Sequence, residues 1–183
     1  NASAIHSSKW LNPKPGTDTA LAMAMVQTII EDGLVERDYV LEQTDLPFLV
    51  RLDTGKFLRG KDLPGTDAAD ADRFWVWDEA TGRPARAPGG GLGTGAMTPE
   101  QHAANTLRLG ALKPALEGRY SVATAAGPVA VTTVYAKVRE LCNRRYTPEQ
   151  AQKITGVHAD NIRAVARTWA RSGAGMIYAG YRS

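Results

Sequence analysis

The most regular pattern of apolar positions in the chain lies in and after the stretch "PKPGTDTALAMAM" at residues 13–25. Apolar residues recur over residues 20–30 at the three- and four-residue spacing of one helix face, and the pattern ends near the following "EDG". Thr17 or Asp18 is well placed to cap this helix, because each side chain has an oxygen that can accept a hydrogen bond from a helix amide. We therefore expect a long amphipathic helix here.

Shorter helical patterns follow along the chain. They cover residues 36–42, 134–145, 147–156 and 158–171. Pro47 prevents the first of them from extending further, because the residue before a proline is biased away from the helical conformation. Thr147, followed three residues later by Gln150, is typical of a helix start, and Gly156 is typical of a helix end.

Alternating and β-branched patterns predict the strands. These are residues 48–52, 73–78 and 176–178, with a β-hairpin formed by residues 118–124 and 127–135. The turn signals "DTGK" and "ATGR" follow the first two strands. The second suggests a hairpin edge or a sheet that covers a neighbour's surface, and Trp75 and Trp77 share a face of this strand. Residues 82–97 are rich in Gly and Pro and have no periodicity, so they predict a long loop. Because strands alternate with helices, the predicted fold class is α/β.

Composition and charge narrow the class of protein. The chain has 183 residues, 43% hydrophobic and 22% charged, which is typical of one soluble globular domain with a core. The net charge of +3 is spread along the chain, and its one basic cluster lies beside Glu140, so we expect no nucleic-acid partner. No apolar run reaches the roughly 18 residues of a membrane span. The chain has no initiator Met and stops within a strand-like pattern, so we expect a piece of a longer protein.

Few residues suggest chemistry by themselves. The single cysteine, Cys142, lies in an apolar helical pattern and is interpreted as a buried structural thiol. The histidines His6, His102 and His158 lack the spacing of metal ligands. The run "GGGLGTG" at residues 89–95 contains spacings of the GxGxxG type, but neither a clear strand before it nor a Walker lysine after it is present. A flexible surface loop is the favoured interpretation.

The tetrapeptide Pro-Gly-Thr-Asp occurs twice, at residues 15–18 and at residues 64–67. The first copy opens the long helix, where unpaired amides and the helix dipole can hold a phosphate or another polar ligand edge. The two carboxylate oxygens of Asp18 can accept paired hydrogen bonds, as from the N1 and N2 edge of guanine, or Asp18 or Thr17 can serve as a simple helix cap. The second copy precedes the polar "AADADRF" and is predicted to be a turn.

Several runs together resemble a known family. They are "NASAIHSSKWLNPKPGTDTALAMAMVQTIIEDGLVERDYV", "QTDLPFLVRLDTGKFLR", "WVWDEATG", "LEGRYSV" and "YTPEQAQKITGVHADNIRAVARTWA". In this order they resemble the catalytic subunit of molybdopterin oxidoreductases. The similarity is greatest to the type II branch of the dimethyl sulfoxide reductases, which includes nitrate, selenate, chlorate and perchlorate reductases and ethylbenzene and dimethylsulfide dehydrogenases.

The resemblance implies a cofactor and a set of residues that bind it. In such enzymes molybdenum is held by two molybdopterin guanine dinucleotides, and the Pro-Gly-Thr-Asp turn helps to bind one guanine nucleotide. Carried over to this chain, Gly16, Thr17 and Asp18 are the cofactor-binding candidates, and Lys14 and Pro15 shape the approach to them. The resemblance therefore favours guanine binding over simple capping for Asp18.

The resemblance also implies how the chain is organised. It predicts part of a multidomain oxidoreductase, with a guanine-nucleotide-binding segment (residues 1–60), a loop and hairpin insertion (61–130) and a helical segment leading into a strand (131–183). Asp45, in "TDLP", matches the segment that follows the helix, and is interpreted as a turn or cap residue rather than as the molybdenum ligand. The ligands of the metal and of the iron-sulfur cluster are expected outside these residues.

The implied activity is that of an enzyme, namely a two-electron oxygen-atom transfer or hydroxylation of a small molecule at molybdenum. Electrons would pass through iron-sulfur centres. The implied partners are an iron-sulfur beta subunit and a haem b subunit, and the implied location is the periplasm, reached through an upstream twin-arginine signal. The alternative is a non-catalytic α/β binding module in which both Pro-Gly-Thr-Asp turns are only helix caps.

Overall fold

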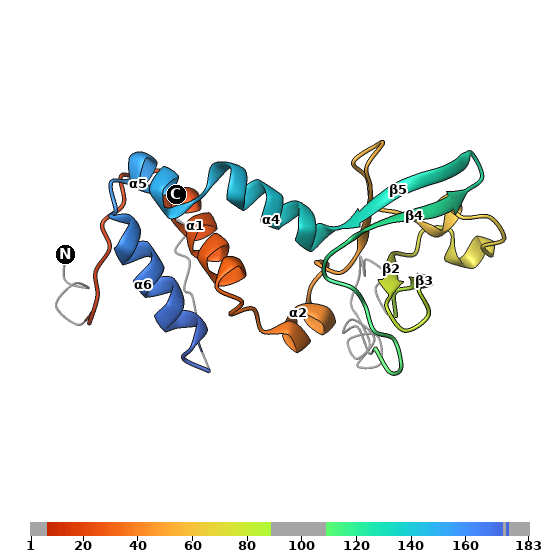
Figure 1. The fold of residues 1–183 in the computed structure, drawn as a ribbon, viewed down its shortest axis with the longest axis horizontal. Helices are drawn as coiled ribbons and strands as arrows, with labels where there is room; N and C mark the ends of the chain where they lie inside the picture. The colour runs from red at the N-terminus through yellow and green to blue at the C-terminus, as the bar shows by residue number, and fades with distance from the viewer. Residues whose placement is uncertain (1–6, 89–108, 174, 176–183) are drawn as a thin grey trace, which may run out of the picture. The chain divides into compact units, whose positions relative to one another are not determined.

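The computed structural model describes residues 7–88, 109–173 and 175. The chain divides into two compact units (Figure 1). We call residues 1–35 with 139–183 the helical unit, and residues 36–138 the β unit. The helices are α1 (Asp18–Glu31), α2 (Arg37–Gln43), α4 (Val134–Arg145), α5 (Pro148–Thr155) and α6 (Ala159–Ala170). The strands are β1 (Leu49–Arg51), β2 (Trp75–Asp78), β3 (Arg83–Arg86), β4 (Arg119–Thr124) and β5 (Gly127–Thr133), and two short 3-10 helices are η2 (Gly60–Asp62) and η3 (Ala68–Asp70).

The helical unit is built on contacts of α1 with α5 and α6. Its core contains Ala24 of α1, Ala151 of α5 and Ile162 of α6, all fully buried, with Val157 from the corner between the last two helices. Small residues at the contact allow the helices to approach closely, and burial of the apolar faces supplies most of the stability of such short helices. The corner between α5 and α6 is therefore packed into the core of this unit through Val157.

The local signals that start and end α5 act as the sequence predicts. The Thr147 hydroxyl accepts a hydrogen bond from the Gln150 amide, and the Gln150 side chain accepts one from the Thr147 amide. Pro148 occupies the first turn, and Gly156 ends the helix in the left-handed conformation with φ of 79°. These contacts satisfy amides and a carbonyl that a helix end leaves without partners.

Ion pairs join the helices of this unit across its surface. Arg167 of α6 donates to Asp32 at 2.6 Å, and Arg139 of α4 donates to Glu31 at 2.9 Å. The hydrogen bond from Arg167 lowers the pKa of Asp32, and the bond from Arg139 lowers the pKa of Glu31, because both favour the charged carboxylate. Pairs as exposed as these contribute little stability individually.

The β unit contains two small antiparallel sheets. One has the strand order β1-β5-β4, with Leu49 opposite Thr133 and Val122 opposite Val129, and the other is the β2-β3 hairpin, with Trp75 opposite Arg86. Alternating side chains of the first sheet enter a core of Leu49, Leu58, Val122 and Val131. Thus the β-hairpin and the mixed α/β class are both confirmed, and the strands pair only with antiparallel neighbours in the part of the chain that the structure describes.

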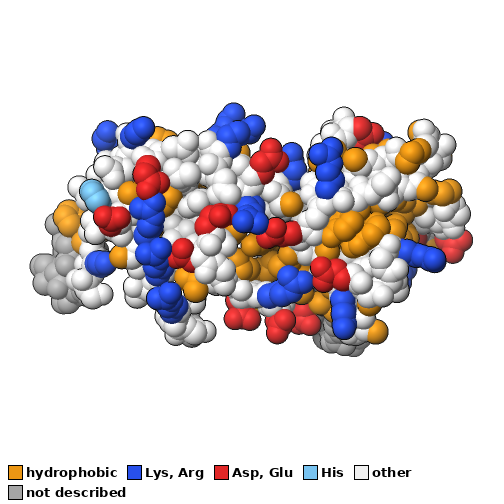
Figure 2. Space-filling view, in the orientation of Figure 1, with side chains coloured by type: hydrophobic (Ala, Val, Ile, Leu, Met, Phe, Trp, Pro, Cys, Tyr) orange, Lys and Arg blue, Asp and Glu red, His pale blue; other side chains and the backbone are white. Residues whose placement is uncertain are grey.

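Three aromatic side chains, Trp75, Trp77 and Tyr120, pack against the core of Leu49, Leu58, Val122 and Val131. The ring of Trp77 stacks on that of Tyr120, with centroids 4.1 Å apart and planes 7° from parallel. All three aromatic side chains stay partly exposed, and Figure 2 shows hydrophobic side chains gathered on the surface near β2. The prediction that the two tryptophans share a face is therefore confirmed.

Asp78, at the end of β2, connects the hairpin turn to the segment before β4. Its buried carboxylate accepts hydrogen bonds from the amides of Ala80 and Lys113 at 3.2 and 3.0 Å, and from the Thr81 hydroxyl at 2.8 Å. The bond from the Lys113 amide, followed by that from Thr81, lowers the pKa of Asp78. This long-range link has no signature in the sequence.

The predicted elements agree with the structure to within about two residues at most ends, and one prediction is wrong. Arg83–Arg86 forms strand β3 and does not belong to the predicted loop of residues 82–97. Pro84 is compatible with this strand because β3 lies at a sheet edge, where a missing amide donor costs little. Residues 89–97 of that loop, and the predicted strand at residues 176–178, lie outside the described residues.

Candidate functional site

The segment of residues 14–18 forms a tight turn followed by the first residue of α1. The Thr17 amide donates to the Lys14 carbonyl at 3.2 Å, and Gly16 has φ of 78°. Pro15 in the second position and a left-handed glycine in the third are the features of a type II turn. Only Gly accepts this conformation without strain, and the space around the position that a Cβ would occupy at Gly16 is open.

The start of α1 is not capped by a side chain. Thr17 occupies the cap position, but its hydroxyl donates to the Lys14 carbonyl at 2.6 Å and accepts no bond from the helix. Asp18 is the first helical residue, so the capping hypothesis for these two side chains is wrong. The Thr17 carbonyl accepts bonds from Ala20 and Leu21, whereas the amides of Asp18 and Thr19 donate to no described residue.

The carboxylate of Asp18 is available for a ligand. It is exposed and makes no hydrogen bond or ion pair with any residue that the structure describes. A carboxylate and two amides at a helix start form a mixed site, in which the carboxylate accepts hydrogen bonds and the amides donate them. Such a site suits a ligand that carries both donor groups and an oxyanion.

The turn is held by the corner between α5 and α6. The Lys14 amide donates to the carbonyl of Thr155 at 2.9 Å, and Thr155 is fully buried. The alkyl part of the Lys14 side chain lies over Gly156, with its Cε 3.5 Å from the position of a Cβ there. Sequence reasoning identified Gly156 as a helix end, but it missed that this corner supports the candidate site. The two segments are about 140 residues apart, and no local pattern connects them.

The second Pro-Gly-Thr-Asp copy lies in the β unit and is a turn, as predicted. Gly65 has φ of 74°, close to the value at Gly16, so the two copies share their glycine conformation. Asp67 then precedes η3, a single short 3-10 turn, and its carboxylate does not cap it. The second copy therefore reproduces the turn of the first but not the long helix behind it.

The remaining candidates for chemistry have structural roles in the described residues. No group of three His, Cys, Asp or Glu side chains that could hold a metal ion occurs there. Cys142 is fully buried, and burial raises the pKa of its thiol, so it is a poor nucleophile, as expected. His158 precedes α6, and its Nδ1 accepts a bond from the Asp160 amide at 3.3 Å. His6 and His102 lie outside the described residues.

The Asp45 carbonyl accepts a hydrogen bond from the Phe48 amide at 3.0 Å, which confirms that Asp45 is a turn residue. In the described part of the chain, no helix is long and apolar enough to cross a lipid bilayer.

Comparison with known proteins identifies relatives of nearly the whole chain. No family model matches the chain. The chain is 39% identical over 181 residues to the respiratory nitrate reductase subunit alpha of Haloferax mediterranei, covering 97% of this chain and 18% of that protein. It is 40% identical over 183 residues to the dimethylsulfide dehydrogenase subunit alpha of Rhodovulum sulfidophilum, covering 99% and 18%. It is 38% identical over 195 residues to the perchlorate reductase subunit alpha of Dechloromonas aromatica, covering 98% and 20%.

These relatives are all alpha subunits of oxidoreductases. The chain belongs to their family, the molybdopterin oxidoreductase alpha subunits, within the type II branch of the dimethyl sulfoxide reductases. It spans about a fifth of the length of these relatives. The resemblance found in the sequence is therefore confirmed at the level of the family.

Proposed function

We propose that this chain is part of the catalytic subunit of a molybdenum-bis(molybdopterin guanine dinucleotide) oxidoreductase, and that residues 14–18 bind one guanine nucleotide. Membership of the alpha-subunit family supports the cofactor class. The observation that carries the assignment to this turn is the exposed Asp18 carboxylate, which has no partner in the described residues and stands beside two amides without acceptors.

The chemistry of these groups fits a guanine nucleotide. The carboxylate of Asp18 can accept hydrogen bonds from N1–H and from the N2 amino group of guanine, and charge-assisted bonds of this kind are the stronger ones. The amides of Asp18 and Thr19 at the positive end of α1, with the Lys14 ammonium, suit a phosphate oxygen. Gly16 has no side chain, so a ligand can approach the backbone closely.

The activity of the whole protein is part of the proposal. When bound, the cofactor supplies the two-electron chemistry at molybdenum, either oxygen-atom transfer or hydroxylation of a small molecule. The residues of this chain bind and orient one of its nucleotides and exchange no electrons themselves. Electron transfer through iron-sulfur centres requires ligands from elsewhere, because the single Cys142 is buried. We extend the proposal to an iron-sulfur beta subunit, a haem b subunit and a periplasmic location by analogy with the family.

The test uses Asp18→Ala in the full-length enzyme, with Asp67→Ala as the matched control in the second copy of the motif. Asp18→Ala removes two charge-assisted hydrogen bonds, so cofactor affinity should fall by about tenfold or more. Molybdenum per enzyme and guanine nucleotide released by acid are measured for both variants. The proposal predicts a loss of both quantities in Asp18→Ala alone. Equal cofactor content in Asp18→Ala and the wild type would refute the role of Asp18.

A further inference from the structure

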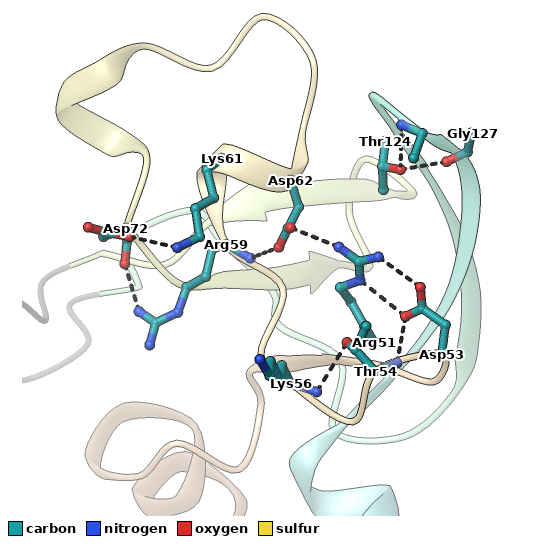
Figure 3. A network of polar contacts seen from close by, with 11 residues as sticks. Arg51, Asp53, Thr54, Lys56, Arg59, Lys61, Asp62, Asp72, Thr124 and Gly127 are labelled. Carbon is teal, nitrogen blue, oxygen red and sulfur yellow. Dashed lines mark hydrogen bonds and ion pairs between the residues drawn. The ribbon is translucent and has the colours of Figure 1, made fainter.

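The β unit contains a cavity whose lining is strongly positive. It has a volume of about 730 Å³ and lies between β1, the turn after it, η2 and the first turn of α4. Its charged lining residues are Arg51, Lys56, Arg59, Lys61, Lys137 and one carboxylate, Asp62. Figure 3 labels all of these residues except Lys137 and draws polar contacts that they form with their neighbours. Three apolar residues, Val50, Phe57 and Val134, belong to the same lining, so the cavity has both charged and apolar walls.

The charge of Arg51 is already compensated within the unit. Its guanidinium donates to Asp53 at 3.1 and 2.7 Å in a bidentate pair, and to Asp62 at 2.8 Å (Figure 3). The hydrogen bonds with Asp53 raise the pKa of Arg51, so the guanidinium stays charged and ordered. Asp62 also accepts a bond from the Arg59 amide at 2.9 Å. The single carboxylate of the lining is therefore occupied by neighbouring groups.

Arg59 is fixed in place without a carboxylate partner in the described residues. Its guanidinium donates to the backbone carbonyl of Asp72 at 2.6 Å and lies over the ring of Phe74, 3.6 Å from the centroid. The Phe57 ring is 5.8 Å away. Stacking of this kind orders a cation without neutralising it, and an ordered side chain loses little entropy when a ligand binds.

Further positive charge surrounds the same cavity. Lys56 is exposed, and its ammonium has no partner among the described residues. Lys137 comes from the first turn of α4, and Val134 of the same turn also lines the cavity. Lys61 forms only an exposed pair with Asp72 at 3.4 Å. Five cationic side chains thus line the cavity, against the single lining carboxylate of Asp62.

From this arrangement we infer that the cavity is a binding site for a small anion of the diphosphate class. The volume lies within the range of small-molecule sites, and ordered cations beside an aromatic ring suit several oxyanion oxygens with an attached organic group. The site is separate from residues 14–18, which belong to the other unit, and the inference does not rest on the proposed function.

The test measures binding of sodium pyrophosphate and of adenosine diphosphate to the full-length enzyme by calorimetry at low ionic strength, where charged contacts are least screened. Lys56→Ala removes one exposed, unpartnered cation and should leave the fold intact. Lys113→Ala is the matched control, because it removes an exposed lysine of the same unit that does not line the cavity. Lys56→Ala should weaken binding of both probes by about tenfold, and Lys113→Ala should not.

The outcomes separate the proposal from its alternatives. Stronger binding of adenosine diphosphate than of pyrophosphate would show that the apolar residues of the lining contact the organic group. Equal binding would show that the cavity recognises the diphosphate alone. Both results support the site. No saturable binding of either probe at concentrations up to about 1 mM would overturn the inference. Equal effects of Lys56→Ala and Lys113→Ala would overturn it too, because they would show only a general charge effect.

Discussion

The same tetrapeptide, Pro-Gly-Thr-Asp, occupies two places in this chain and leads to two different structures. Both copies place glycine in the left-handed conformation, with φ of 78° at Gly16 and 74° at Gly65. The first copy opens a 14-residue helix, and the second opens a three-residue 3-10 turn. The turn is thus a local property of the tetrapeptide, whereas a helix start with unpaired amides and a dipole depends on the residues that follow.

The two copies differ also in what supports them. The first is bonded through the Lys14 amide to the buried corner at Thr155, in the helical unit. The second belongs to the β unit, where its residues line a cavity of about 550 Å³ beside Trp75 and Trp77. A short motif therefore identifies a ligand site only together with the element behind it and the contacts beneath it.

The largest expected difference between the copies comes from their glycines. Gly16→Val and Gly65→Val each force a β-branched residue into the left-handed region, at a cost of about 1 to 3 kcal/mol. If only the first turn binds the cofactor, Gly16→Val should remove most of the bound molybdenum, and Gly65→Val should leave it unchanged. Metal analysis of the two purified variants measures this. Loss of molybdenum in both variants would show that the copies are equivalent.

A smaller effect is expected at the corner that supports the first turn. Gly156 has φ of 79°, so Gly156→Ala should lower the stability of the helical unit by about 1 to 2 kcal/mol. The added Cβ would meet the Lys14 Cε at 3.5 Å, which is an ordinary contact, so no further cost is expected. Urea unfolding followed by circular dichroism measures the change. A much larger loss would indicate that the corner and the turn are packed more tightly than this geometry implies.

The smallest expected effect is a change of stability with pH in the β unit, which contains the second copy. The pKa of Asp78 is lowered in the folded chain, so its stabilising contribution is present at pH values above its ordinary pKa of about 3.9. This contribution is lost as the pH falls through the lowered pKa, because the protonated group no longer accepts the same hydrogen bonds.

Asp78→Asn tests this dependence on pH. The variant should melt at a lower temperature than the wild type near neutral pH, and the difference should shrink on acidification below about pH 4. Thermal unfolding followed by tryptophan fluorescence, which reports on nearby Trp75 and Trp77, measures the difference at each pH. A difference that stays constant across the acid range would contradict the role of the charged carboxylate.

Local signals in the sequence predicted most of the secondary structure. The capping box at Thr147, the left-handed Gly156 and the alternation around Val122 each act over a few residues, so a single sequence contains the information. Strand β3 was missed because Pro84 and the nearby glycines resemble a loop, and its pairing with Trp77 depends on a neighbouring strand.

The candidate site was predictable only in part. Its residues follow from the turn signature and from the resemblance to the family. The position of Gly16 in a tight turn depends only on the neighbouring residues, so the sequence predicts it. The sequence did not predict that the Asp18 and Thr19 amides lack an acceptor in the described residues, because the Thr17 hydroxyl could equally have accepted a bond from the helix as a cap. The contact between Lys14 and Thr155, and that between Asp78 and Lys113, join segments far apart in the sequence.

A structure of the full-length enzyme with its cofactor tests the central claim most directly. The quantities to measure are the distances from the Asp18 carboxylate oxygens to atoms N1 and N2 of the nearer guanine. If Asp18 binds the guanine edge, both distances should lie within hydrogen-bonding range, about 2.7 to 3.2 Å. A structure in which both guanines bind elsewhere and the Asp18 carboxylate faces solvent would contradict it.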